Sequence, residues 1–204
     1  MGAQSEYDAR QDKRLGVSTG ADRYEKDDPN HSRYEPTAYR VLERLAESGW
    51  LEREDVLADY GCGRGRVSFC LHHALGVSTV GIEYNRALYE EALGNLAGYQ
   101  GRRHGADGIR FVCANAEDYR VEEENCFYFF NPFSVKILQA VVRRIFDSYY
   151  ARPRPMKLFF YYATDDYREY LMTEPGMEYA GEIDMRDLFG GEDEKEKILI
   201  FTVG

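Results

Sequence analysis

A short segment near residue 60 combines an acidic side chain with three glycines at every second position. After the apolar run Val56–Ala58, the sequence reads Asp59-Tyr60-Gly61-Cys62-Gly63-Arg64-Gly65. Glycine costs folding entropy, so three so close together predict a backbone that bends sharply or meets a ligand closely. An apolar run, a glycine-rich turn and a helical pattern are typical of the first unit of a nucleotide-binding α/β sheet.

The glycine spacing also distinguishes between kinds of nucleotide. A dinucleotide-binding turn needs a third glycine three residues after Gly63, where this chain has Arg66, and no phosphate-binding Gly-Lys-Ser/Thr follows. A ligand without a pyrophosphate is therefore expected. At the end of the next predicted strand, 18 residues beyond Gly65, Glu83 can accept hydrogen bonds from both hydroxyls of a ribose. Such charge-assisted bonds are typically worth about 1.5–3 kcal/mol each.

Two further polar segments follow the third and fourth predicted strands. They read Asn115-Ala116-Glu117-Asp118 and Asn131-Pro132-Phe133. Because ligands bind outside the carboxyl ends of the strands in sheets of this type, Asn131 is expected to face the cleft. Each has a structural alternative, since polar residues cap turns and proline commonly ends a strand.

Strand and helix patterns alternate along the rest of the chain. Strands are predicted at residues 56–60, 79–84, 109–114, 126–130, 158–163, 177–184 and 198–203, and helices at 36–50, 67–74, 86–97, 134–149 and 166–172. The alternation predicts a parallel sheet with helices on both faces, and the closing strand pair predicts an antiparallel element at one side. Residues 1–35 are charged and poor in apolar periodicity, so we expect a flexible N-terminal arm or lid before one domain of residues 36–204.

Four features occur in this order along the chain: the turn Asp59–Gly65, Glu83, the segment Asn115–Asp118 and the segment Asn131–Phe133. Together they resemble the motifs of the class I S-adenosylmethionine-dependent methyltransferases, over about residues 36–204. The resemblance implies a Rossmann-like three-layer α/β/α sandwich, with a seven-stranded, mostly parallel sheet whose last strand is antiparallel. It also implies S-adenosylmethionine as the cofactor, with the glycine turn under its methionine part. The binding residues implied are Asp59, Gly61, Cys62, Gly63, Gly65, Glu83, Tyr84, Asn115, Ala116 and Asn131. Asp118 is an alternative to Asn115 as the contact of the adenine amine.

The segment Asn131-Pro132-Phe133 is similar to the Asn-Pro-Pro-Phe/Tyr motif of methyltransferases that act on adenine or glutamine amide nitrogens. One proline is missing, so Phe133 lies one position early. The similarity implies that these three residues serve catalysis. It slightly favours a nitrogen acceptor on a protein or small molecule, with nucleic acid left open. The alternative is a non-catalytic S-adenosylmethionine-binding module or partner subunit.

The 17 tyrosines are numerous for 204 residues, and Tyr34, Tyr39, Tyr161 and Tyr162 are expected near the cleft. Two interpretations stand beside each other: an aromatic cage for a cation, or packing with the hydroxyls at the rim. The turn Arg33–Thr37 is expected to fold over the cofactor, because similar enzymes use the segment before the first strand in that way.

Composition restricts the partners further. The net charge of −10 and the pI near 5.0 argue against a strongly phosphate-neutralising surface. No apolar stretch approaches the roughly 18–20 residues that cross a bilayer, and the N-terminus is no secretory signal, so a cytoplasmic protein is expected. The cysteines are expected to be buried, reduced thiols, and neither they nor the histidines show metal-ligand spacing.

Overall fold

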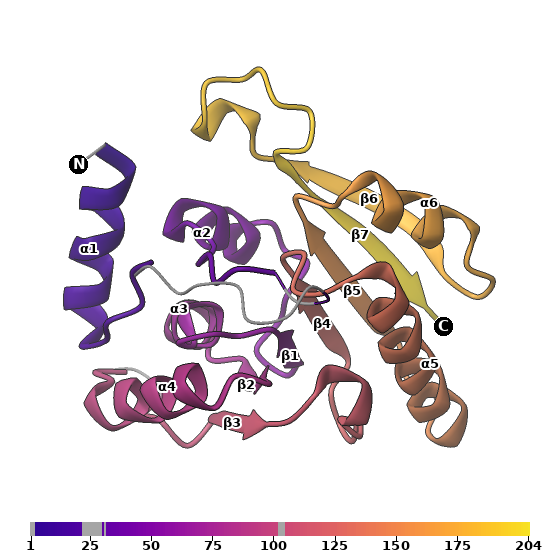
Figure 1. Ribbon diagram of the computed structural model, residues 1–204, viewed down its shortest axis with the longest axis horizontal. Helices are drawn as coiled ribbons and strands as arrows, with labels where there is room; N and C mark the ends of the chain where they lie inside the picture. Colours follow the sequence, from indigo (N-terminus) through magenta and orange to yellow (C-terminus); the bar gives the residue numbers. More distant parts are fainter. Residues whose placement is uncertain (1–2, 22–29, 31, 102–104) are drawn as a thin grey trace.

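The computed structural model describes residues 3–21, 30, 32–101 and 105–204. At its centre lies one seven-stranded sheet in the order β3-β2-β1-β4-β5-β7-β6 (Figure 1). The strands from β3 to β5 are parallel, and β7 runs antiparallel to both of its neighbours. The predicted sheet with its antiparallel last strand is therefore confirmed. The strands are β1 (Val56–Tyr60), β2 (Ser78–Glu83), β3 (Ile109–Cys113), β4 (Cys126–Phe129), β5 (Met156–Tyr161), β6 (Glu178–Asp184) and β7 (Lys197–Val203).

Helices cover both faces of this sheet and complete the three-layer sandwich. They are α1 (Ala3–Leu15), α2 (Tyr39–Glu47), α3 (Arg66–Leu75), α4 (Arg86–Gly98), α5 (Val135–Ala151) and α6 (Asp165–Thr173), with short 3-10 turns η1 (Ala116–Asp118) and η2 (Arg186–Leu188). Successive strand residues point to opposite faces, so Leu57 packs in the core under α1–α4 and Ala58 in the core under α5 and α6. The predicted helices all occur, with ends shifted by a few residues.

Helix α1 lies within the segment that the sequence predicts to be an arm. Its last residue, Leu15, and the following Val17 are buried in the core, and the Tyr7 hydroxyl donates to the Glu43 carboxylate on α2. Apolar periodicity misses this helix because polar contacts supply much of its packing. Residues 22–29 and 31, which also belong to the predicted arm, lie outside the described residues, and the role of the segment as a lid stays a prediction.

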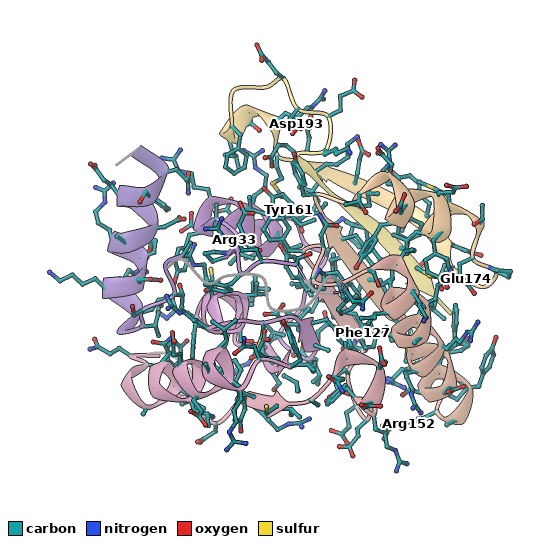
Figure 2. All side chains as sticks on the ribbon, in the orientation of Figure 1. Arg33, Phe127, Arg152, Tyr161, Glu174 and Asp193 are labelled. Carbon is teal, nitrogen blue, oxygen red and sulfur yellow. The ribbon has the colours of Figure 1, made fainter. Side chains whose placement is uncertain are left out.

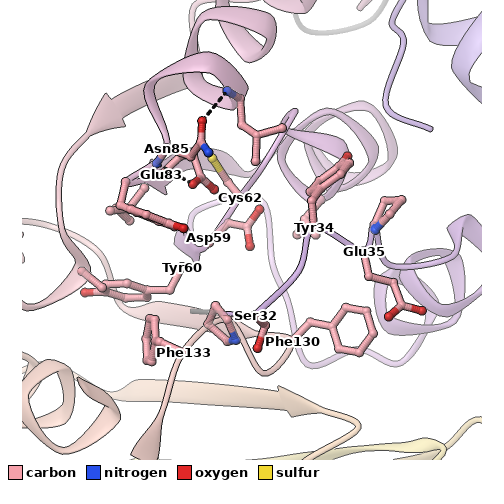
Figure 3. Close-up of a pocket in the computed structure, with 18 of the residues that line it drawn as sticks. Ser32, Tyr34, Glu35, Asp59, Tyr60, Cys62, Glu83, Asn85, Phe130 and Phe133 are labelled. Carbon is pink, nitrogen blue, oxygen red and sulfur yellow. Dashed lines mark hydrogen bonds between the residues drawn. The ribbon is translucent and has the colours of Figure 1, made fainter. Parts of the chain in front are cut away.

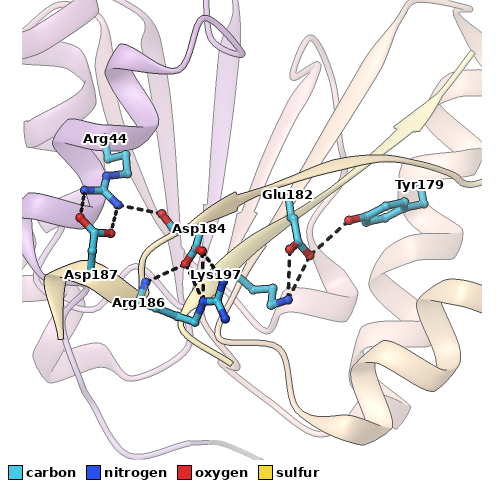
Figure 4. A network of polar contacts seen from close by, with 7 residues as sticks. All are labelled: Arg44, Tyr179, Glu182, Asp184, Arg186, Asp187 and Lys197. Carbon is cyan, nitrogen blue, oxygen red and sulfur yellow. Dashed lines mark hydrogen bonds and ion pairs between the residues drawn. The ribbon is translucent and has the colours of Figure 1, made fainter. Parts of the chain in front are cut away.

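Ion pairs link the connection of the C-terminal hairpin to α2 and also join the two strands of the hairpin (Figure 4). Arg44 of α2 pairs with Asp187 of η2 and donates to the backbone oxygen of Asp184. Lys197 pairs with Glu182 across the hairpin at 3.1 Å. Exposed pairs of this kind are worth little singly. The contacts of Arg44 are the ones that hold the β6–β7 connection beside α2.

Cysteine exposure differs from the expectation at one position. Cys62, Cys70 and Cys126 are buried thiols, whereas Cys113 is exposed at the end of edge strand β3. An edge strand has a neighbour on one side only, which leaves its terminal side chain in solvent.

Candidate active site

The turn between β1 and α3 bends through left-handed glycines. Gly61 has φ 75° and Gly63 has φ 52°, a region that other residues rarely adopt. Close packing adds a second constraint, because a Cβ atom at Gly63 would lie 2.1 Å from the ring of Tyr34. A Cβ at Gly61 would lie 2.5 Å from Cβ of Pro132. The glycines therefore let the segments around Tyr34 and Pro132 approach the end of β1.

Replacing Gly63 with alanine is expected to lower the free energy of unfolding by about 1–3 kcal/mol, because of the left-handed backbone and the clash with Tyr34. Urea denaturation measures the change. Gly94→Ala is the matched control: Gly94 is exposed on α4 with no atom near its Cβ position. Alanine there is expected to be neutral or to stabilise by up to about 1 kcal/mol. Equal effects of the two substitutions would contradict the steric role of Gly63.

A cavity opens at the carboxyl ends of β1, β2 and β4 (Figure 3). It holds about 980 Å³ of space, its open mouth included. Glu83 and Asn85 lie toward one end of it, and Glu35 and Phe130 toward the other. Its walls come from the turn after β1, the end of β2, the segment before α2 and the aromatic segment after β4; they include Ser32, Arg33, Tyr34, Glu35, Pro36, Thr37, Asp59, Tyr60, Gly61, Cys62, Ile82, Glu83, Tyr84, Asn85, Ala114, Ala116, Tyr128, Phe130, Pro132 and Phe133.

Two carboxylates line this cavity from adjacent strands. Glu83, 4% exposed, accepts hydrogen bonds from the backbone N–H groups of Gly63 at 2.9 Å and Asn85 at 2.8 Å. Asp59 is 3% exposed, and its Oδ2 has no hydrogen-bond partner in the part of the chain that the structure describes. Burial, and next the negative charge of Glu83, raise the pKa of Asp59 to about 8. Asp59 is therefore placed to take up a donor or a positive charge.

The structure brings most of the predicted site residues to this cavity and leaves four of them elsewhere. Gly63 and Gly65 shape the turn behind its wall, and Asn115 lies in a neighbouring surface depression, where its amide donates to Asp118 at 3.1 Å. Asn131 has φ 42°, and its side-chain amide donates to the backbone oxygen of Tyr162 and accepts from Thr164 N–H at 3.4 Å. Pro132 and Phe133, the other members of its motif, line the cavity.

No family model matches the sequence. A stretch of 67 residues is 35% identical to a protein-lysine N-methyltransferase from Saccharolobus islandicus, covering 32% of this chain and 42% of that protein. The chain thus spans less than half the length of that relative.

Solved structures match much more of the chain. A putative methyltransferase from Escherichia coli has a TM-score of 0.62 at 15% identity, covering 83% of this chain and 89% of that one. An RNA methyltransferase from Salinibacter ruber, in complex with S-adenosyl-L-homocysteine, gives 0.52 at 20% identity over 83% and 94%. The glycopeptide N-methyltransferase MtfA, complexed with S-adenosylmethionine, gives 0.56 at 12% over 83% and 98%. The chain has the class I methyltransferase fold.

Within this fold, the structure adds Arg66 as a functional candidate that the motifs did not indicate. Arg66 is 3% exposed; its Nε donates to Thr19 Oγ1 at 2.7 Å, and its guanidinium pairs with Asp8 at 3.1 Å and lies over the Tyr39 ring. It fastens the N-terminal segment to the start of α3, beside the cavity. In the sequence its only signal is an arginine directly before an apolar helical run.

The four tyrosines singled out by sequence divide between packing and the cavity. Tyr39 is buried and donates to Asp12 at 2.7 Å, while Tyr161 and Tyr162 donate to Glu196 and Asp193, both at 2.6 Å. Tyr34 lines the cavity and lies against the glycine turn. Its hydroxyl donates to the backbone oxygen of Thr19 at 2.8 Å, which links this wall of the methyltransferase fold to the N-terminal segment.

The described residues contain neither a membrane-spanning helix nor a metal-binding cluster. No helix among the described residues has the length and apolar character to span a bilayer. Across residues 3–21, 30, 32–101 and 105–204, no group of three or more His, Cys, Asp or Glu side chains is arranged to hold a metal ion.

Proposed function

We propose that the protein is an S-adenosylmethionine-dependent methyltransferase. The observation that carries this proposal is the unpartnered, buried oxygen of Asp59 in a cavity shared with Glu83. S-adenosylmethionine has an ammonium and a sulfonium, which suit Asp59, and ribose hydroxyls, which suit the carboxylate of Glu83. Two carboxylates lining one cavity therefore fit a cationic nucleoside better than a pyrophosphate.

Other predicted residues complete the proposed cofactor site. Gly61, Cys62 and Tyr84 line the same cavity, and Gly63 and Gly65 shape the turn behind its wall. Ala116 lies at the adenine end, with Asn115 or Asp118 as the contact of the adenine amine. Arg33, which also lines the cavity, suits the methionine carboxylate.

When bound, the cofactor supplies a methyl group on a positively charged sulfur. The protein must hold the acceptor in line with that group and exclude water, and alignment can lower the barrier by about 7–11 kcal/mol in favourable cases. Phe130, Pro132 and Phe133 line the cavity with apolar surface suited to this task. Asn131 is proposed to shape the loop that presents them, since its amide holds the backbone of Tyr162 and Thr164.

A nitrogen acceptor on a protein or small molecule is favoured. The relative from Saccharolobus islandicus is named a protein-lysine N-methyltransferase, and MtfA is named a glycopeptide N-methyltransferase. The second candidate is a cofactor-binding module without methyl transfer. The Asn131 amide donates to the backbone oxygen of Tyr162 and not into the cavity, which favours the module. Its two motif neighbours, Pro132 and Phe133, line the cavity, which favours the enzyme.

Calorimetric titration of the full chain with S-adenosylmethionine, S-adenosylhomocysteine and NAD tests the proposal. Binding of both sulfur nucleotides and not of NAD is expected. Binding of NAD alone would contradict the proposed cofactor. Transfer of tritiated methyl groups to protein, nucleic acid and metabolite fractions then separates the enzyme from the module, because tight binding without transfer to any fraction supports the module.

Cofactor binding is expected to depend on the ionisation of Asp59. With a pKa of about 8, this carboxyl is mostly protonated at neutral pH, and a nearby ammonium or sulfonium favours its ionised form. Binding should therefore release a proton, and the affinity should rise with pH until about 8 and then level off. Calorimetry at neutral pH in buffers of different ionisation enthalpy counts the protons. Asp59→Asn should remove the release, and proton uptake by the wild type would show the assignment to be wrong.

A further inference from the structure

Aromatic and acidic side chains from four separate parts of the chain lie at and beside one end of the cavity. Glu35 and Phe130 line the cavity, and the Phe130 ring centroid lies 4.7 Å from that of Tyr161. Tyr161 lies at the end of β5, and its hydroxyl donates to Glu196 at 2.6 Å. Tyr162 donates likewise to Asp193. We use the name acidic rim for this group of side chains: Glu35, Tyr161, Tyr162, Asp193 and Glu196. Figure 2 shows Tyr161 at one end of the sheet and Asp193 beyond it.

The rim carboxylates lie close enough to affect one another. Burial raises the pKa of Glu196, and the charges of Asp193 and Glu35 raise it further, while the hydrogen bond from Tyr161 lowers it. At the β6–β7 connection, Arg186 pairs with Asp184, Lys197 with Glu182, and Lys195 with Asp165 at 3.2 Å. The hydrogen bond from Tyr162, and then Lys195, lower the pKa of Asp193. A cationic ligand would relieve this concentration of negative charge.

Exposure of the rim indicates the size of the ligand. Asp193 is exposed, as are the neighbouring Glu192 and Glu194, and none of the three lines the cavity. A small amine would fill only the cavity, whereas a basic protein segment would also contact this outer surface. The whole chain carries a net charge of −10, which draws basic partners in general.

We propose that the acidic rim admits a lysine side chain of a basic protein as the methyl acceptor. The inference rests on the proposed function and names its substrate class. Two observations support it besides the acidic cluster. Glu35 of the rim lines the cavity whose unpartnered, buried Asp59 oxygen marks the proposed cofactor site, and the relative of matching sequence is named for lysine.

The rim also suits the proton balance of amine methylation. A lysine ammonium must lose one proton before its nitrogen can attack, and that proton passes to solvent at the open mouth of the cavity. The nitrogen lone pair forms the new N–C bond while the C–S bond breaks, and the bonding electrons stay on sulfur. The products are a methylammonium and a neutral thioether, so the positive charge moves from sulfur to nitrogen and remains beside the rim.

The first test compares acceptors with tritiated S-adenosylmethionine and the full chain. Histones are basic and lysine-rich, serum albumin is lysine-bearing and acidic, and histones with acetylated amines lack the nucleophile. Labelling of histones is expected to be about tenfold or more faster than that of albumin, to weaken with salt, and to vanish on acetylation.

Equal labelling of albumin, persistence after acetylation, or no histone labelling at saturating cofactor would each overturn the inference. Transfer to nucleic acid or to a hydroxyl would overturn it as well and leave the proposed methyltransferase function intact. Absence of S-adenosylmethionine binding by calorimetry would instead contradict the proposed function itself, so the two failures are distinguishable.

The second test neutralises the rim. The double variant Glu35→Gln and Glu196→Gln is expected to raise KM for histones about threefold to tenfold, with kcat and the affinity for S-adenosylmethionine changed far less. The matched control is Glu122→Gln with Glu123→Gln, which removes the same charge from exposed residues beside the opposite ends of the strands. Equal changes of KM in both double variants would show that overall charge, not the rim, selects the acceptor.

Discussion

Replacing Glu83 with alanine is expected to lower the affinity for S-adenosylmethionine by at least about 100-fold, because two charge-assisted hydrogen bonds to the ribose would be lost. The variant also removes the acceptor of the Gly63 and Asn85 N–H groups, which holds the glycine turn against the end of β2. Both losses act on the same binding step. Isothermal titration of the purified variant measures the dissociation constant directly.

Two controls separate binding from folding. Glu83→Gln keeps one acceptor oxygen in place, so an affinity between those of the wild type and the alanine variant is expected. Glu90→Ala removes an exposed carboxylate of α4 outside the cavity lining, and wild-type affinity is expected. If Glu83→Ala is folded and binds as tightly as the wild type, Glu83 does not hold the ribose.

The substitution Arg66→Met is expected to lower the free energy of unfolding by about 3–5 kcal/mol, since it breaks a buried ion pair and leaves its partners behind. The Arg66 guanidinium donates to Asp8, to the hydroxyl and backbone oxygen of Thr19, and to the backbone oxygen of Thr37. Thr19 is fully buried, so its freed oxygens would not regain water without local opening. Urea denaturation monitored by circular dichroism gives the value.

Arg86→Met is the matched control for Arg66→Met. Arg86 is the first residue of α4, as Arg66 is the first residue of α3. Its side chain is 80% exposed and pairs with Glu90 on the same helix. A cost of less than about 0.5 kcal/mol is expected for it. Similar costs for the two variants would mean that the buried network of Arg66 contributes no more than a surface pair.

The Arg66 network also connects stability to the proposed site. The backbone oxygen of Thr19 accepts hydrogen bonds from both Arg66 and the Tyr34 hydroxyl. The Tyr34 ring in turn lies against Gly63. Loss of Arg66 would therefore loosen a wall of the cavity as well as the N-terminal helix. Weaker cofactor binding by Arg66→Met, at a temperature where the variant is folded, is the expected consequence.

Local patterns in the sequence were sufficient to predict the fold. Strand and helix periods are properties of neighbouring residues, and the glycine spacing of the turn after β1 depends on backbone conformations set within a few residues. The same locality explains why Asp59 and Glu83 were found, because each lies within the last two residues of its own strand. The parallel order of the strands then brought both carboxylates to one edge.

Tertiary structure alone decided which of the candidate side chains meet the cavity. Asn131 was predicted from its place after β4, but its left-handed backbone turns its amide to Tyr162. Arg66 pairs with Asp8, 58 positions away, and Tyr161 with Glu196, 35 positions away. Such contacts join residues that are far apart in the sequence, so the spacing of residues within one segment cannot predict them. The sequence by itself determined the sheet, the glycine turn and the two strand-end carboxylates that we propose to hold the cofactor. The acidic rim and the buried arginine exist only because the folded chain brings distant charges together.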